Sequence, residues 1–108
     1  IVKLAHLLTV LIMELHLILL KLSLKSGRMH QIRAQFSYIG HPVLCDQIYG
    51  DSDVNVRCKE LGLNRMFLHC SSLRLEIGKY QLFIESELPN ELHQFLKQTR
   101  THAHMEAF

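Results

Sequence analysis

The sequence predicts an α+β fold: a mostly antiparallel mixed sheet that carries two to three short helices. Apolar and polar residues alternate near the start of the chain and again over 66–85, which is the period of half-buried strands. Over 29–39 the apolar residues recur at helical spacing instead. The 108 residues allow one modest core, and the apolar fraction of 48% and charged fraction of 20% are typical of a folded chain.

The most apolar stretch, residues 4–24, predicts two strands at about 5–12 and 16–25 with a turn near Glu14. Leucines in its second half alternate with lysine and serine, so that strand has one wet face. A membrane-spanning helix needs about 20 apolar residues with few charges. Glu14 and His16 lie at the middle of this stretch, where such groups are costly. Two strands are therefore the preferred interpretation, and a small membrane-associated hairpin protein is an alternative.

A helix is expected over 29–39, after Gly27 breaks the second strand. Ile32, Phe36 and Ile39 fall on one face of this helix, which predicts that the face packs on a core. Gly40 fits the helix stop, because glycine tolerates the left-handed conformation that often ends a helix. The pair His41-Pro42 then requires an extended exit.

The second half of the chain predicts a short helix, a hairpin and a last helix. Residues 50–64 are polar and irregular, with the short helix around Val56–Leu61. The segment 66–85 has the alternation of two strands on either side of Gly78-Lys79, a two-residue turn. Pro89 suits the start of the last helix, which is amphipathic.

Residues 1–100 are expected to form one folded unit, and 101–108 a flexible tail without usable periodicity. The chain begins with Ile1 rather than Met, which suggests a fragment. Its formal charge of +2 does not by itself indicate a nucleic-acid-binding protein, so any such argument depends on local clustering.

The cysteines Cys45, Cys58 and Cys70 predict reduced thiols. They are odd in number and contain no Cys-x-x-Cys pair, and no signal peptide is recognised in the sequence. Their spacing to neighbouring histidines matches no compact zinc motif, so no metal site is predicted. A cytosol-like compartment is the simplest account.

The segment SGRMHQIR places two arginines where a strand gives way to a helix. Helix N-termini attract anions, and each guanidinium can bind a phosphate or carboxylate through two donors. Arg33 and Ile32 lie one helical step apart, about 100°. One can therefore face a polar cleft while the other contacts its apolar wall. A plain structural salt bridge is an equally good interpretation at this point.

The longer run GRMHQIRAQFSYIGHPVLCDQIYG resembles the signature of the pseudouridine synthases that modify ribosomal large-subunit RNA. That family has Gly-Arg-x-His-Gln-(Ile/Leu)-Arg, then Gly-His-Pro-(Ile/Val), then Gly-Asp-x-x-Tyr. The matching residues are Gly27, Arg28, His30, Gln31, Ile32, Arg33, Gly40, His41, Pro42, Val43, Asp46 and Tyr49. Downstream, Leu68-His69-Cys70 and the segment LFIESELP are also similar to the family, so the likeness covers about residues 3–97.

Two departures from the family pattern stand out. Cys45 replaces the glycine that usually precedes the aspartate, and a non-glycine residue is strained there if φ is positive. The family's nucleophile is an aspartate in an Arg-Leu-Asp motif, and this sequence has aspartates only at Asp46, Asp51 and Asp53. The chain therefore looks like the C-terminal portion of a pseudouridine synthase catalytic domain without its central acid.

The resemblance also implies roles for individual residues. Arg33 would be the partner of the absent aspartate, holding it ionised, and Ile32 would form a wall of the uracil pocket. Residues expected to bind RNA or to support the motif by hydrogen bonds are Lys25, Arg28, His30 and Gln31. Residues expected to be structural are Gly27, Gly40, His41, Pro42, Asp46, Tyr49 and His69, with Asp46 and Tyr49 fixing the loop after the helix.

The function that the resemblance implies is uridine-to-pseudouridine isomerisation in ribosomal or transfer RNA. The expected partners are RNA and the missing N-terminal half of the catalytic domain, without which this chain is expected to be inactive. No metal, organic cofactor or membrane is implied, and the expected compartment is the cytoplasm, with an organelle left open. The alternative is a truncated relative that binds RNA or a partner without catalysis.

Overall fold

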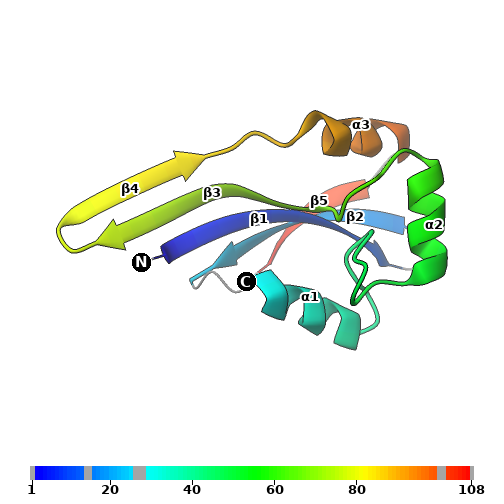
Figure 1. Ribbon diagram of the computed structural model, residues 1–108, viewed down its shortest axis with the longest axis horizontal. Helices are drawn as coiled ribbons and strands as arrows, with labels where there is room; N and C mark the ends of the chain where they lie inside the picture. Colours follow the sequence, from blue (N-terminus) through cyan, green and yellow to red (C-terminus); the bar gives the residue numbers. More distant parts are fainter. Residues whose placement is uncertain (1, 14–15, 26–28, 100–101, 108) are drawn as a thin grey trace.

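The computed structural model describes residues 2–13, 16–25, 29–99 and 102–107, and within these it shows a mixed sheet with helices on both sides (Figure 1). The strand order is β4-β3-β1-β2-β5, and only the β2–β5 pair is parallel. The predicted α+β class is therefore confirmed. The strands are β1 (Val2–Met13), β2 (His16–Leu24), β3 (Leu68–Ile77), β4 (Tyr80–Glu85) and β5 (His102–Ala107). The helices are α1 (Met29–Tyr38), α2 (Ser52–Glu60) and α3 (Asn90–Thr99).

The two strands predicted near the start of the chain are β1 and β2, which pair antiparallel over their whole common length. The turn expected near Glu14 lies outside the described residues. The hairpin predicted over 66–85 is confirmed as β3 and β4, which meet at the pair Ile77–Tyr80. Gly78, in the turn between them, has a φ of +58°, which glycine adopts without a steric penalty.

The prediction of a flexible tail at 101–108 was wrong for most of that segment. Residues 102–107 form β5, which runs parallel to the exposed edge of β2. The sequence HAHMEA does alternate polar and apolar residues, the period of a strand. This segment becomes a strand because the edge of β2, which is distant in sequence, pairs with it.

The helix predicted over 29–39 is α1, and its stop at Gly40 is confirmed. Gly40 has a φ of +86°, and its N–H donates to the carbonyl of Ser37 over 3.0 Å. The N–H of His41 donates to the carbonyl of Phe36 over 2.9 Å. These two bonds form a Schellman motif, which turns the chain sharply away from the helix axis.

α2 begins at Ser52, four residues earlier than expected. The Asp51 side chain accepts hydrogen bonds from the backbone N–H groups of Asp53 and Val54, so it caps the helix at that point. An N-cap aspartate stabilises a helix by about 1 kcal/mol relative to alanine. The expected helix around Val56–Leu61 is therefore the second half of a longer one.

The apolar residues form two clusters, one on each face of β2. Leu20 and Leu22 pack with Ile32 and Phe36 of α1. Leu17 and Leu19, which alternate with them, pack against a second cluster that contains Leu92 and Phe95 of α3. Figure 1 accordingly shows α1 and α3 on opposite sides of the sheet. Within the part of the chain that the structure describes, no helix is long and apolar enough to cross a membrane.

Candidate active site around Arg33

Arg33 of α1 and Asp46 of the following loop form a bidentate ion pair. The Nε of Arg33 donates to Oδ2 of Asp46 over 2.7 Å, and Nη2 donates to Oδ1 over 2.8 Å. The Asp46 side chain has no exposed surface, and that of Arg33 is 17% exposed. Because the pair is shielded from water, its two hydrogen bonds are stronger than those of a surface salt bridge.

The Asp46 carboxylate is also anchored by the backbone of its own loop. Oδ1 accepts the N–H groups of Ile48 and Tyr49, each over 3.0 Å. The hydrogen bonds from Arg33, supported by these two, lower the pKa of Asp46 from its ordinary value of 3.8 to about 2. The same pairing raises the pKa of Arg33. Both groups are therefore charged throughout the physiological range.

Two residues that the sequence analysis did not single out shape this loop. Asn55 of α2 accepts the N–H of Cys45 over 2.8 Å and donates to the carbonyl of Asp46 over 3.0 Å. The N–H of Gly50 donates to the same carbonyl over 3.0 Å. A Cβ at Gly50 would lie 2.2 Å from that oxygen, so only glycine fits. Gly50 directly follows Tyr49 of the sequence signature, so the sequence offers a reason to single it out. The residues around Asn55 give no such indication of its role.

Tyr49 connects the ion pair to the first turn of α1. The carbon at the centre of the Arg33 guanidinium lies 5.4 Å from the centre of the Tyr49 ring, within range of a cation–π interaction. The Tyr49 hydroxyl is 2.5 Å from Nε2 of His30. Ser37 donates its hydroxyl to the Tyr49 carbonyl over 2.9 Å. Three residues of α1 thus contact the loop that contains Asp46 and Tyr49.

Cys45 occupies a strained backbone position, as its replacement of glycine suggested. Its φ is +60°, in the left-handed region that costs a non-glycine residue about 1–2 kcal/mol. Its thiol is buried and contacts the carbonyl oxygen of Leu63 at 3.5 Å. Burial raises the pKa of Cys45, and that of the nearby Cys58 to about 11. Both thiols therefore stay protonated and unreactive.

The Arg33 side chain lines a cavity of about 330 Å³ between α1, α2 and the segment that leads into β3. Two other cationic side chains, Lys59 and Arg65, line the same cavity. Arg65 is fixed in part by a hydrogen bond of 3.2 Å to the carbonyl of Leu68. The charge of Arg33 is shared with Asp46, so Lys59 and Arg65 supply the excess positive charge of the lining, which favours an anionic occupant such as a carboxylate or a phosphate.

The other predicted site residues are dispersed. Ile32 is buried in the cluster beneath α1, so its expected contact with uracil stays a prediction. Gln31 and Lys25 are exposed. His69 is buried on β3, with Nε2 3.0 Å from the carbonyl oxygen of Ser86. Gly27 and Arg28 lie outside the described residues.

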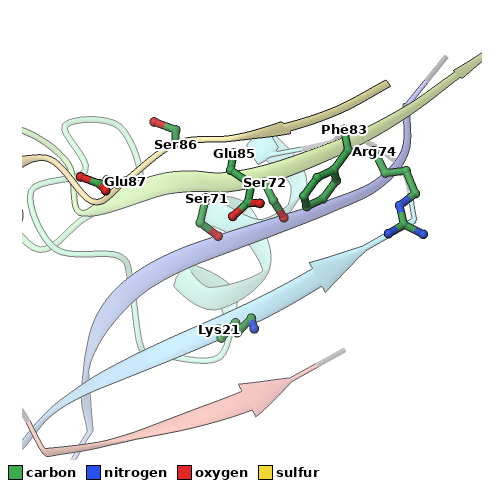
Figure 2. A pocket seen from close by; sticks show the side chains of 8 residues that line it. All are labelled: Lys21, Ser71, Ser72, Arg74, Phe83, Glu85, Ser86 and Glu87. Carbon is green, nitrogen blue, oxygen red and sulfur yellow. The ribbon is translucent and has the colours of Figure 1, made fainter. Parts of the chain in front are cut away.

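A second hollow, of about 670 Å³, lies on the sheet (Figure 2), and Arg33 is not part of its lining. Its walls come from β2, β3, β4 and the residues that follow β4. The residues that line it are Lys21, Ser71, Ser72, Arg74, Phe83, Glu85, Ser86 and Glu87. Its two cations and two carboxylates balance, so this hollow does not select for anions as the first one does. The Arg74 guanidinium covers the Phe83 ring at 5.6 Å.

The chain is similar in sequence to several known proteins. No family model matches it. It is 44% identical over 84 residues to the ribosomal large subunit pseudouridine synthase C of Haemophilus ducreyi, which is 76% of this chain and 26% of that protein. The Haemophilus influenzae protein of the same name is 51% identical over 61 residues, 56% of this chain and 19% of its own length. The Yersinia pestis protein of that name is 37% identical over 91 residues, 82% of this chain and 28% of its own length.

The chain thus spans about a quarter of the length of the relatives it matches. The alignments with the Haemophilus ducreyi and Yersinia pestis proteins cover 76% and 82% of this chain. Arg33 and Asp46, two residues of the sequence signature, form an ion pair that is shielded from water. Over the part that it shares with these relatives, the chain belongs to the family of ribosomal large-subunit pseudouridine synthases.

Proposed function

We propose that this chain forms the arginine-bearing part of an RNA pseudouridine synthase active site. In this proposal Arg33 binds and keeps ionised a nucleophilic aspartate that another polypeptide segment supplies. The observation that carries it is the placement of Arg33, which lines a cationic cavity while Asp46 holds one edge of its guanidinium. The reaction is an isomerisation of uridine, and it needs neither a metal nor an organic cofactor.

The guanidinium has donors to spare for a second carboxylate. Arginine carries five N–H groups, and Asp46 accepts two of them. A nucleophilic aspartate in a closed site would be driven toward its neutral form by burial, and a cation within about 4–6 Å offsets that effect. Asp46 is then a positioning residue, because it fixes the plane in which Arg33 presents its remaining donors.

The chemistry replaces one glycosidic bond by another. The bond from N1 of uracil to C1′ of the ribose breaks, the bond from C5 to C1′ forms, C5 loses its proton and N1 gains one. A base within folded RNA must leave its stack to react, at a cost of a few kcal/mol. The cations Lys59 and Arg65 beside Arg33 suit contacts with the RNA backbone, which would offset part of that cost.

None of the aspartates in these 108 residues is placed to be the nucleophile. Asp46 is already paired with Arg33, Asp51 caps α2, and Asp53 is an exposed residue in the first turn of that helix. We therefore expect the chain alone to form no pseudouridine. Its partners in this proposal are RNA and the polypeptide that carries the aspartate.

A second candidate function is RNA or partner binding without catalysis. The bidentate contact between Arg33 and Asp46 favours it, because an ion pair that forms within this chain is also what a purely structural arginine would make. The two candidates differ in whether Arg33 acts on a reacting group.

A chimera tests the proposal. The 84 matching residues of the Haemophilus ducreyi relative are replaced by the corresponding residues of this chain, and pseudouridine formation is measured in ribosomal RNA fragments. We expect activity in the chimera, and loss of turnover on Arg33→Ala with a much smaller loss of RNA affinity. Arg33→Lys, which keeps the charge but not the bidentate fork, should also be strongly impaired. Equal losses of turnover and RNA affinity, or a folded but inactive chimera, would contradict the proposal.

A further inference from the structure

We propose that β4 is a self-association edge, on which β4 of a second copy of this chain adds antiparallel to extend the sheet. β4 ends the strand order on its side of the sheet, and all six of its residues are exposed. An edge strand presents backbone N–H and C=O groups that can pair with another strand. This inference does not depend on the proposed function and concerns a different part of the molecule.

The two faces of the β3–β4 hairpin differ in chemistry. The cross-strand pairs Leu73–Ile84, Leu75–Leu82 and Ile77–Tyr80 lie on one face, which is apolar. Leu82 is 52% exposed and Ile84 is 44% exposed, so nothing in the described chain covers this face fully. A second strand that paired with β4 would continue this apolar face and cover part of its exposed surface.

The opposite face of the hairpin is mainly polar, because polar residues alternate with the apolar ones along both strands. The pairing of β1 with β3 shifts register between the pairs His6–Ser72 and Leu7–Cys70. Beyond that point the pairs Ser72–Glu85 and Arg74–Phe83 share a face with Lys21 (Figure 2).

β4 lacks the usual protection of an edge strand. Natural sheets guard their edges with inward-pointing charges, proline or bulges in the edge strand itself. The segment YQLFIE contains no proline, and its pairing with β3 runs without interruption. The nearest charges stand only at its ends, Lys79 before the strand and Glu85 at its close.

Those two charges define a self-complementary register. A two-fold axis through Leu82 pairs each residue with the one equally far on the other side, so that Lys79 lies opposite Glu85 of the partner. The same register pairs Tyr80 with Ile84 of the partner and Leu82 with its own copy. The apolar face then continues across both copies, and both charge pairs of the interface form at once, as an isologous contact requires.

Other occupants fit this edge less well. A foreign strand would need both an apolar alternation and charges of opposite order at its two ends. A second copy supplies both. When its β4 runs antiparallel and is centred on Leu82, its Glu85 lies opposite Lys79 and its Lys79 lies opposite Glu85. Registers centred on neighbouring residues break the match between Lys79 and Glu85.

The first test measures the mass of the purified 108-residue chain by sedimentation over a range of concentrations. We expect a monomer–dimer equilibrium. Lys79→Glu should raise the dimer Kd about tenfold, because two attractive pairs become repulsive. The double exchange of Lys79→Glu with Glu85→Lys should restore the original Kd. A monomer at all concentrations, or a double exchange no better than the single variant, overturns the proposal.

The second test identifies the register by cysteine cross-linking. Residues directly opposite in antiparallel strands have Cα atoms about 4.5–5.5 Å apart, within the range that a disulfide spans. Leu82→Cys should therefore cross-link two copies under mild oxidation. Ile84→Cys is a matched control on the same face of the same strand, and it should not, because Tyr80 lies opposite it. The unmodified chain reports any background from Cys70. Equal cross-linking of both variants would indicate aggregation and overturn the register.

Discussion

The guanidinium of Arg33 and the carboxylate of Asp46 meet edge to edge, joined by two hydrogen bonds of 2.7 and 2.8 Å. Arg33→Ala would leave the covered Asp46 carboxylate without its cation. Removing one partner of a buried ion pair costs about 3–5 kcal/mol, so we expect a loss of that order in the free energy of unfolding. Urea denaturation checks it. The control is Lys25→Ala, an exposed cation of the same region, which should change stability by less than about 0.5 kcal/mol.

The stability of the fold should depend on pH through Asp46. Its pKa is lowered from 3.8 to about 2, chiefly by Arg33. A lowered pKa stabilises the folded state fully above the unfolded value, and this contribution disappears as the pH falls from about 4 to about 2. The expected size is about 2 kcal/mol. Urea denaturation across this window measures it, and Asp46→Asn, although less stable overall, should lose this part of the pH dependence. An unchanged pH profile in the variant would assign the dependence to other carboxylates.

The backbone at Cys45 offers a direct test of strain. Cys45→Gly and Cys45→Ala both remove the buried thiol, but only glycine relieves the positive φ of 60°. We expect the glycine variant to be more stable than the alanine variant by about 1 kcal/mol. Thermal unfolding of the two variants side by side gives this difference. The opposite order would show that the loop accommodates a side chain without strain.

Gly50 should tolerate no side chain. A Cβ there would come within 2.2 Å of the Asp46 carbonyl oxygen, which is backbone and cannot move aside cheaply. Gly50→Ala should therefore destabilise the chain by at least about 2 kcal/mol and loosen the Arg33–Asp46 pair. Gly62→Ala is a contrasting control: a Cβ there would meet open space, but the φ of +96° is unfavourable for alanine, so this variant reports a backbone penalty without a clash. A smaller loss at Gly50 than at Gly62 would contradict the steric argument.

The cations around the Arg33 cavity should contribute to RNA affinity without sequence preference. Lys59→Gln and Arg65→Gln each remove one positive charge from the lining of that cavity. If each side chain contacts a phosphate, each change should weaken binding of different RNA sequences alike and reduce the slope of log K against log salt by roughly 0.7–0.9. Fluorescence titration at several salt concentrations checks this. Lys97→Gln, on α3, is the control and should leave the slope unchanged.

The features predicted correctly from sequence are those that local chemistry determines. The stop of α1 depends on Gly40 and the hairpin turn on Gly78, and each signal lies within a few residues of its effect. The pairing of Arg33 with Asp46 could not be anticipated as a closed bidentate contact, because it needs the loop after α1 to fold back across 13 residues. Asn55 escaped notice for the same reason, since it acts only through α2 being placed beside that loop.

The formation of β5 by residues 102–107 could not be predicted from the local sequence. Residues 102–107 have the alternation of a strand but no flanking turn signals, and their pairing depends on an edge offered by β2, far away in sequence. The position of Ile32 is similar. Its helical spacing predicted a buried face, and the structure places it there, but spacing alone does not distinguish the wall of a ligand pocket from the interior of a core.

Asp46 fixes the orientation of the Arg33 guanidinium within this chain. A free arginine side chain has about 2 kcal/mol of rotamer freedom to lose when it is immobilised. Here the contact with Asp46 already restricts the side chain in the folded protein, so a second carboxylate that bound to Arg33 would cause a smaller further loss of rotamer freedom. Assembly of a complete catalytic centre from separate pieces of polypeptide would be favoured by this arrangement.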